Sequence, residues 1–247
     1  MVVATLLIEG MFILTGMEVY GQEQPQQQPA SPSTSLSTDE TTEWMSSFNL
    51  ENCDFASTGE NSYFILIPGY QVTLEGEEDG EDLQLVMTVL NETKVVDGIE
   101  TRVVEEKETE GGNLVEISRN YFAICKPTNN AIYFGEDVDM YEDGEIVSHE
   151  GAWLAGANGS KAGMIMPGKV EVGLKYYQEI APGVAEDRAE IIGVNDTLDT
   201  PAGNFQNVLR TEETNPLEPG VKESKFYAPG IGLIQEEALV LVKYTKP

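Results

Sequence analysis

The chain is 247 residues long and carries 43 acidic side chains against 14 basic ones, which gives a formal net charge of −29 at pH 7. A surface this negative repels phosphate backbones and anionic lipid head groups, so the composition excludes nucleic acid as a partner and leaves membrane contact only to an N-terminal anchor. Zinc sites and catalytic triads need histidine with suitable partners, and one histidine and two cysteines argue against both. We therefore expect no cofactor and no metal centre.

Residues 1–21 are predicted to form a signal peptide. The apolar run Val2–Leu14 is followed by small and polar residues, and Val19 and Gly21 satisfy the small-residue rule for cleavage after Gly21. A membrane span needs about 20 apolar residues, and this run is shorter. The prediction is an extracytoplasmic protein, secreted or on the cell surface, with an uncleaved N-terminal anchor as the alternative.

Residues 22–45 are predicted to be a linker, because Gln22–Thr42 consists mainly of Gln, Pro, Ser and Thr. A segment of this composition cannot bury a core, so we expect a disordered tether. The ordered domain is then 46–247.

From residue 63 onward the sequence predicts short antiparallel strands. Asp79-Gly80, Asp97-Gly98, Gly111-Gly112 and Asp143-Gly144 are hairpin signals between apolar or alternating runs. No stretch after the signal peptide has the apolar stripe and caps of a helix. The expected strands are Tyr63–Ile67, Gln71–Glu75, Leu83–Leu90, Thr101–Glu105, Leu114–Ile124, Ile132–Gly135, Val138–Tyr141 and Ile146–His149. The predicted fold class is all-β and mainly antiparallel, with little helix.

Cys53 and Cys125 are the only cysteines, and such a pair in an exported chain predicts a disulfide, with two buried free thiols as the alternative. Asn91, Asn158 and Asn195 each begin an Asn-X-Ser/Thr triplet and are candidate glycosylation sites.

Asp139–Glu150 has part of the spacing of an EF-hand loop, with acidic residues at the first, fifth and last positions and Gly144 at the sixth. Tyr141 occupies a ligand position and the flanks resemble strands, so Asp143-Gly144 is predicted to be a hairpin turn that binds no calcium. His149, the only histidine, is expected at the surface or at a strand edge.

The segment Glu150–Gly168 contains five glycines and Trp153 but no strand alternation. We expect a packed loop over 150–168 that connects two halves of the domain, with glycines that let another group approach its backbone. Trp153, Gly156 and Lys161 are its candidate ligand-binding residues. The alternative is that Trp153 fills the gap between the halves, since aromatic residues near glycines commonly serve packing.

The two halves resemble each other at one constant offset. Asp82 and Asp187, Gly98 and Gly203, Val103 and Val208, and the triplets Tyr121–Ala123 and Phe226–Ala228 are all the same number of residues apart. This pattern predicts an internal repeat, 70–136 and 170–237, of two similar meanders that form a sandwich or half-barrel. Arg119 and Lys225, just before the triplets, should then lie at equivalent points.

Six segments within residues 60–237 carry a family resemblance: Tyr63–Gly69, Tyr133–Glu136, Gly151–Gly156, Gly183–Asp187, Pro216–Pro219 and Lys225–Gly232. In this order they resemble a family of uncharacterised exported bacterial and archaeal proteins with a YFPLxPG-like opening, a GxWxAG central motif and a KYYAPGIG-like C-terminal motif. Ile65 stands where the family usually has proline, and Ala162 where a proline before glycine is commoner. The resemblance implies export and a β-rich domain, and it implies no activity.

Together these features predict an exported acidic β-domain that binds an unknown ligand or an envelope partner. The alternatives are an extracytoplasmic hydrolase acting through acidic residues and a structural component of the cell envelope. Paired carboxylates could carry out hydrolysis, but no pair stands out by its spacing, so no catalytic residue is assigned. Two facing carboxylates in a deep pocket would favour the enzyme, and an apolar groove beside Trp153 would favour binding.

Overall fold

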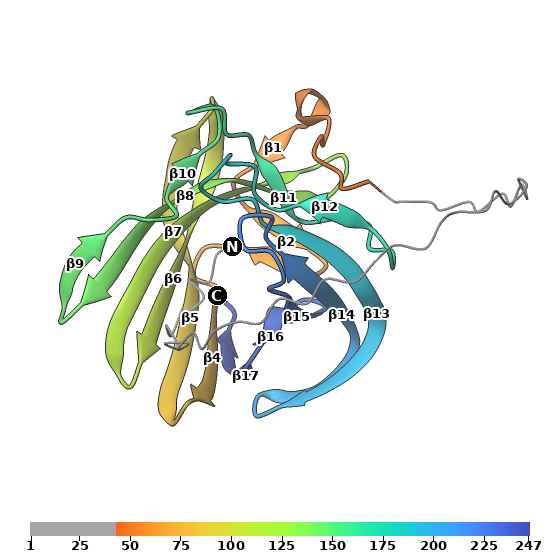
Figure 1. Cartoon of the computed structure of the whole chain (residues 1–247). Coiled ribbons are helices and arrows are strands. Elements are labelled where there is room, and N and C mark those ends of the chain that lie inside the picture. The colour runs from red at the N-terminus through yellow and green to blue at the C-terminus, as the bar shows by residue number, and fades with distance from the viewer. Residues whose placement is uncertain (1–42) are drawn as a thin grey trace, which may run out of the picture. The chain divides into compact units, whose positions relative to one another are not determined.

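The computed structural model describes residues 43–247, and nearly all its elements are antiparallel strands (Figure 1). The predicted signal peptide and residues 22–42 of the predicted linker lie outside the described residues. Within 43–247 the only helix is the short 3-10 helix η1 (Leu50–Asn52). The predicted fold class is confirmed.

Five strands form the first meander: β4 (Gln71–Glu78), β5 (Glu81–Val96), β6 (Ile99–Glu110), β7 (Asn113–Cys125) and β8 (Asn130–Glu142). The pairs Asp79-Gly80 and Asp97-Gly98 connect the first three, and all four residues have positive φ. That backbone matches the twist of a two-residue hairpin, which is why these turns can be recognised in the sequence. β8 is one strand where the sequence predicts two, because Glu136, which interrupts the apolar pattern, is itself buried.

The second meander consists of β12 (Lys175–Tyr177), β13 (Arg188–Thr200), β14 (Gly203–Thr214), β15 (Glu223–Ala228), β16 (Gly232–Glu236) and β17 (Leu239–Thr245). β17 pairs with β4 and thereby joins both meanders into a single sheet. Figure 1 shows this sheet curling, so that β5 to β8 face β13 and β14. The path ends at β10 on one side and at β12 on the other without closing into a barrel, so the half-barrel alternative describes it better than the sandwich.

Arg119 and Lys225 do not occupy equivalent points, and that prediction is wrong. The Arg119 side chain is 38% exposed and pairs with Glu105 and Asp139, whereas the Lys225 side chain is 1% exposed. Arg119 precedes its aromatic triplet by two residues and Lys225 by one. Because strand side chains alternate between faces, the two point in opposite directions. The internal repeat itself stays a prediction.

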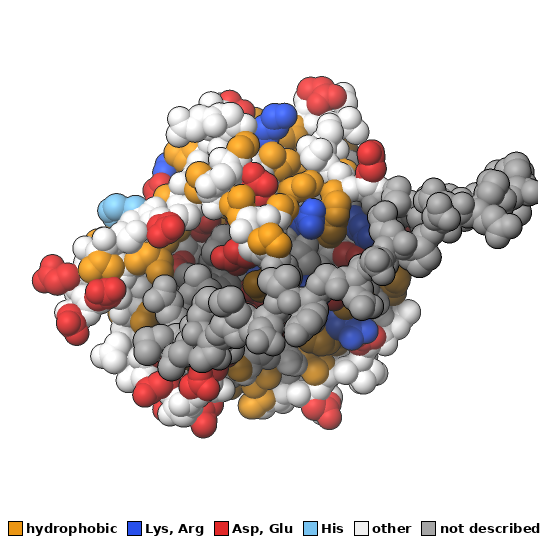
Figure 2. All heavy atoms as spheres, in the orientation of Figure 1, with side chains coloured by type: hydrophobic (Ala, Val, Ile, Leu, Met, Phe, Trp, Pro, Cys, Tyr) orange, Lys and Arg blue, Asp and Glu red, His pale blue; other side chains and the backbone are white. Residues whose placement is uncertain are grey.

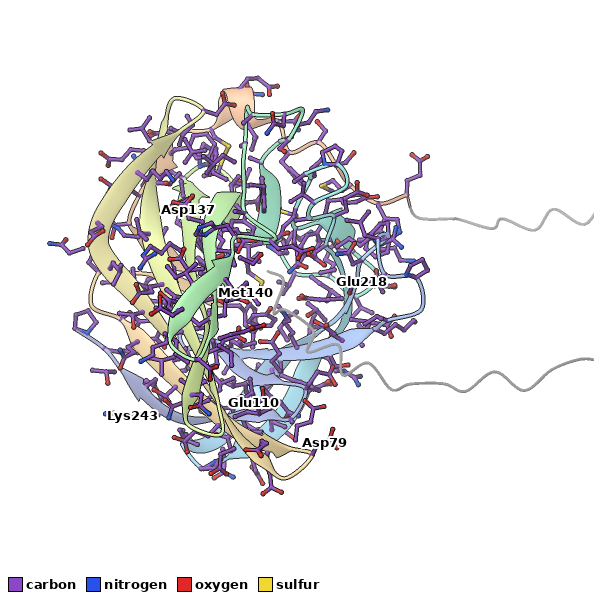
Figure 3. The ribbon with its side chains drawn as sticks, turned by 60° about the vertical axis from the view of Figure 1, so that its left-hand side comes forward. Asp79, Glu110, Asp137, Met140, Glu218 and Lys243 are labelled. Carbon is purple, nitrogen blue, oxygen red and sulfur yellow. A yellow bond between two sulfur atoms is a disulfide. The ribbon has the colours of Figure 1, made fainter. Side chains whose placement is uncertain are left out.

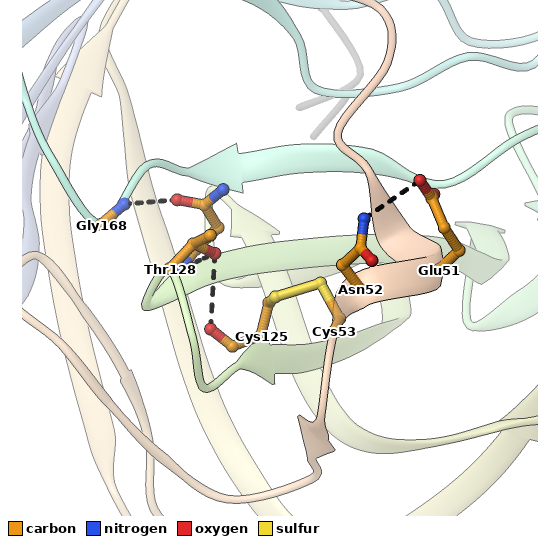
Figure 4. Close-up of a disulfide and its surroundings, with 7 residues drawn as sticks. Glu51, Asn52, Cys53, Cys125, Thr128 and Gly168 are labelled. Carbon is orange, nitrogen blue, oxygen red and sulfur yellow. Dashed lines mark hydrogen bonds between the residues drawn. A yellow bond between two sulfur atoms is a disulfide. The ribbon is translucent and has the colours of Figure 1, made fainter.

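Short elements cover one end of the sheet. β1 (Phe55–Ala56) pairs with β7, while β2 (Gly59–Asn61) and β3 (Phe64–Leu66) form a separate two-stranded sheet. The predicted disulfide is confirmed: Cys53 is bonded to Cys125, 72 residues away, and ties the segment after η1 to the end of β7 (Figure 4).

The turn Asp143-Gly144 connects β8 to β9 (Glu145–Ser148) and has the positive φ angles of a two-residue hairpin. The predicted hairpin is therefore confirmed in place of an EF-hand. His149 follows β9 with a side chain that is 67% exposed, and its Nδ1 lies 2.7 Å from the carbonyl oxygen of Val138. This is the expected position at a strand edge.

The segment 150–168 contains two short strands where the sequence predicts only a loop. β10 (Trp153–Leu154) and β11 (Gly163–Met166) both pair with β8. Gly135 of β8 permits the first pairing, because a Cβ there would overlap the backbone of β10. Strands this short carry too little alternation to be recognised.

Candidate functional site

Acidic side chains line the inner face of the curved sheet. In β6, Val104, Glu106 and Glu108 share one face, and Glu108 lies opposite Glu116 of β7. Val104 and Glu116 are buried, as is Leu85, which lies opposite Glu108 in β5. This face is therefore the interior. Figure 3 shows Met140 of β8, which lies opposite Glu116 in the register, at the same wall.

The second meander contributes charged residues to the same interior. Lys225 of β15 lies between Thr211 of β14 and Glu236 of β16, and Glu213 lies opposite Glu223. In the described chain six glutamates are buried: Glu106, Glu116, Glu136, Glu179, Glu213 and Glu236. On the outer surface, by contrast, acidic side chains are spread over the visible face (Figure 2).

Two carboxylates hold Lys225. Its Nζ lies 3.1 Å from Oε2 of Glu213 and 2.7 Å from Oε1 of Glu236, and all three side chains are at most 5% exposed. The other oxygen of Glu213 accepts hydrogen bonds from Gln178 at 3.1 Å, Thr211 at 3.2 Å and Tyr227 at 3.4 Å. The ammonium group and three polar donors together stabilise Glu213 as an anion.

The pKa shifts of Glu213 and Lys225 favour the charged form of each group. Burial raises the pKa of Glu213, but Lys225 and Gln178 outweigh burial and bring the pKa below its usual value. Burial likewise lowers the pKa of Lys225, and Glu213 and Glu236 more than reverse this, so its pKa lies well above the usual value. Both groups are therefore charged at neutral pH.

Within residues 43–247, Glu106 and Glu116 of the first meander form no such ion pair. Burial, with repulsion from Glu236, raises the pKa of Glu106 to about 8, and burial raises that of Glu116 to about 7. Burial and the charge of Glu116 raise the pKa of Glu108 well above its usual value. Like charges directly opposite each other destabilise a sheet, and keeping a proton relieves the repulsion.

Glu136 of β8 and Glu179, in the loop after β12, form a second acidic group. Burial, with the charge of Asp187, raises the pKa of Glu179 to about 7. Burial and the charge of Glu179 raise the pKa of Glu136 well above its usual value. Trp153 lies opposite Glu136 in the register, and its ring packs edge-on against Tyr133 with centroids 5.3 Å apart.

Several buried polar atoms in this interior have no hydrogen-bond partner within residues 43–247. They include the acceptor oxygens Oε1 of Glu106, Glu136 and Gln178, while Trp153 Nε1 and the Tyr176 hydroxyl are donors. An unpaired buried polar group costs about 1–3 kcal/mol. Arg102, the other buried cation of the described chain, donates to the carbonyl oxygens of Ser57 and Glu92 instead. The interior thus suits a group that brings positive charge and hydrogen-bond donors.

No family model, curated protein or solved structure matches the chain. The family resemblance drawn from the motifs stays a prediction. Two pairs of its segments are neighbours: Gly151–Gly156 pairs with Tyr133–Glu136 through β10 and β8, and Gly230 N donates to the carbonyl oxygen of Ser62, next to the opening segment. These segments also supply Glu136, Asp187 and Lys225 to the acidic region.

In the part of the chain that the structure describes, no helix is long and apolar enough to cross a membrane. The disulfide is compatible with a location outside the cytoplasm, where such bonds persist.

The three predicted ligand-binding residues lie in different environments. Trp153 is 5% exposed and packs against Tyr133, as its packing alternative predicts. Gly156 and Lys161 are exposed, and the backbone N–H of Lys161 donates to the carbonyl oxygen of Ile180. Ligand binding by these residues stays a prediction.

The glycosylation candidates Asn91, Asn158 and Asn195 are all exposed, which is the condition that modification requires. Their glycosylation stays a prediction.

A separate hollow of about 520 Å³ lies beside the disulfide. Much of its lining is apolar and comprises Met45, Phe48, Pro127, Met164, Pro167 and Leu174. Lys169, the cation in its lining, is exposed and pairs with Glu171. The hollow has no buried charged group that would select a ligand, and Trp153 does not line it.

The interior glutamates were not identified as site residues from the sequence. The available signal was alternation, since Glu106 and Glu108 share the parity of the apolar Val104. Acidic residues on strands usually face water, however. Glu105 lies next to Glu106 in the same stretch of sequence, so the local sequence does not show which of the two points inward. Only the pairing of β6 with β7 separates the two faces.

Proposed function

We propose that this chain is an exported binding protein whose acidic interior takes up a small organic cation outside the cytoplasmic membrane. The observation that carries the proposal is that Glu106, Glu116 and Glu136 are buried on the inner face, whereas the one buried lysine beside them in the described chain is paired with Glu213 and Glu236. Buried charges are retained in proteins when they are paired, and a cationic ligand would pair Glu106 and Glu136, which form no ion pair with Lys225.

Lys225 is an internal example of the contact. Its primary ammonium lies within 3.1 Å of two carboxylates, a distance range that an alkylammonium ligand would also adopt. The unpaired oxygens of Glu106 and Glu136 offer acceptors for such a group.

An organic cation fits this interior better than a metal ion. Calcium takes six to eight oxygen ligands arranged around one point. No group of three or more metal-binding side chains in 43–247 is arranged in this way. An ammonium group needs only two or three acceptors and accepts a looser arrangement.

A hydrolase is the second candidate. Glu213 has a lowered pKa, whereas that of Glu106 is raised to about 8, so the two have opposite protonation states at neutral pH. A base and an acid in one interior are what carboxylate-based hydrolysis needs.

Calorimetric titration of the mature protein with 1,4-diaminobutane tests the proposal, with 1,4-butanediol as the uncharged control. We expect saturable binding of the diamine alone, weakened at least about tenfold by Glu136→Gln, since a hydrogen bond to a charged group contributes about 1.5–3 kcal/mol. Glu77→Gln, at an exposed position of β4, removes the same charge and should leave the affinity unchanged.

Absence of binding for the diamine, propylamine and guanidinium would reject the proposal, as would equal affinity in the Glu136 and Glu77 variants. Turnover of aryl glycosides that Glu106→Gln and Glu213→Gln each abolish would establish the hydrolase instead.

A further inference from the structure

We infer that the acidic interior binds its cation in exchange for protons, so that binding releases protons at neutral pH and weakens as the pH falls. This inference rests on the proposed function, because it concerns the same interior and the same class of ligand.

The geometry of the sheet brings like charges together. Glu108 and Glu116 are direct cross-strand partners on the inner face of the first meander, and Glu106 is the next inward residue of β6. Glu213 and Glu223 are direct partners in the second meander. Carboxyl groups in such positions cannot all be ionised unless a cation lies among them.

The one interior lysine compensates only part of this charge. Lys225 is paired with Glu213 and Glu236 of the second meander. In the described chain neither Glu106 nor Glu136 forms an ion pair, and one oxygen of each has no hydrogen-bond partner. Protons therefore take the place of cations at the first meander.

The titratable groups that face this region come from three parts of the chain. The first meander contributes Glu106, Glu108, Glu116 and Glu136, and the second contributes Glu213, Glu223, Lys225 and Glu236. The loop before β13 adds Glu179 and Asp187. Burial raises the pKa values of Tyr133, Tyr176 and Tyr227, so these tyrosines remain neutral. The exchangeable protons near neutral pH therefore belong to carboxyl groups.

The exchange conserves charge in the interior. An alkylammonium enters, the O–H bond of one protonated carboxyl breaks, and its proton passes to water or buffer. The resulting carboxylate accepts an N–H from the ligand. Because one positive charge replaces another, the interior gains no net charge, and the large cost of burying an uncompensated ion is avoided. The raised pKa values of Glu106, about 8, and of Glu116 and Glu179, about 7, place these protons in the range where exchange is measurable.

The test is calorimetric titration of the mature protein with 1,4-diaminobutane at pH 7 in phosphate and in MOPS, whose ionisation enthalpies differ and neither of which is a primary ammonium. We expect the apparent enthalpy to depend on the buffer with a slope equal to release of about one proton for each ammonium group that enters the interior, which is at most two per diamine. The affinity should then fall about tenfold for each unit of pH below 7 per proton released. Glu106→Gln, which removes one exchangeable proton, should lower the slope, and Glu77→Gln should leave it unchanged.

Binding with the same enthalpy in both buffers and no change in affinity between pH 6 and pH 8 would overturn the exchange while leaving the binding function intact. No binding by any ammonium probe would instead reject the proposed function. If Glu106→Gln does not fold, Glu116→Gln provides the same comparison from the neighbouring strand.

Discussion

The interior holds two kinds of charged side chain. Some are paired with a group of opposite charge, and others are acidic groups without such a pair in the described chain. The Lys225 ammonium is held by Glu213 and Glu236, whereas Glu106 and Glu116 face the same interior and form no ion pair within the described part of the chain. A buried ion pair adds little net stability over an apolar substitute, but removing one partner leaves the other charge buried and alone. The effect of replacing one of these residues on the free energy of unfolding should therefore depend on pH.

Replacing the lysine tests this dependence. Lys225→Met should destabilise the protein by about 3–5 kcal/mol at pH 7, because Glu213 and Glu236 lose their cation. At pH 5 the loss should be smaller, since these carboxyls can then take up protons. Urea unfolding at both pH values measures the difference. Lys222→Met is the control: its pair with Glu212 is exposed and should contribute less than about 1 kcal/mol. Equal effects of the two variants would contradict the ion-pair account.

The stability of the unaltered protein should fall as the pH rises from 5 to 9. A glutamate whose folded pKa is raised binds more protons folded than unfolded, so its contribution is complete below the unfolded pKa and is lost as the pH passes the folded pKa. For Glu116 and Glu179 that limit is about 7, and for Glu106 about 8. Glu213, whose pKa is lowered, opposes this trend only in acid. Melting temperatures that increase steadily over this range would contradict the assignment.

At the scale of elements, the hairpins were predictable and the short strands were not. Asp97-Gly98 and Asp143-Gly144 adopt a backbone that few other residue pairs allow, so the sequence identifies these turns locally. β10 and β11 exist only because the edge of β8 accepts them, and Gly135 provides the room. Pairing with a strand that is distant in the sequence leaves no local pattern by which β10 and β11 could be recognised.

The disulfide fixes the segment after η1 to β7, and its removal tests how much this attachment stabilises the domain. Because the bond spans 72 residues, the double variant Cys53→Ala/Cys125→Ala should lose about 4 kcal/mol of unfolding free energy. Thiol titration of the denatured, unreduced protein provides the accompanying check. Two reactive thiols in material from its own compartment would show that the bond does not form there.

The side chain of Trp153 in β10 packs against Tyr133 of β8. As it is 5% exposed and packs against Tyr133, Trp153→Ala should leave a cavity and cost about 3–5 kcal/mol. Denaturant unfolding of the variant beside Trp44→Ala, a partly exposed tryptophan, measures this. A loss below about 1 kcal/mol for Trp153→Ala would place the ring in contact with solvent and favour its role as a ligand anchor.

At the scale of the molecule, two meanders joined through β17 and β4 bring the residues of distant strands to one interior. The sequence predicts the meanders from their turns and alternation. It cannot predict that Glu108 faces Glu116 or that Lys225 lies beside Glu236, because strand register depends on pairing across the sheet. The acidic interior was therefore not predictable from residue spacing, although the fold class was.

The most direct measurement of the central claim is a carbon-13 NMR titration of the glutamate carboxyl groups, with and without 1,4-diaminobutane. In the free protein we expect Glu106 to titrate near pH 8 and Glu116 and Glu179 to titrate near pH 7. Saturating diamine should shift these titrations to lower pH, because the cation stabilises each carboxylate. If every glutamate titrates within about one unit of the ordinary value near 4.3 and none responds to the diamine, the interior neither stores protons nor binds a cation.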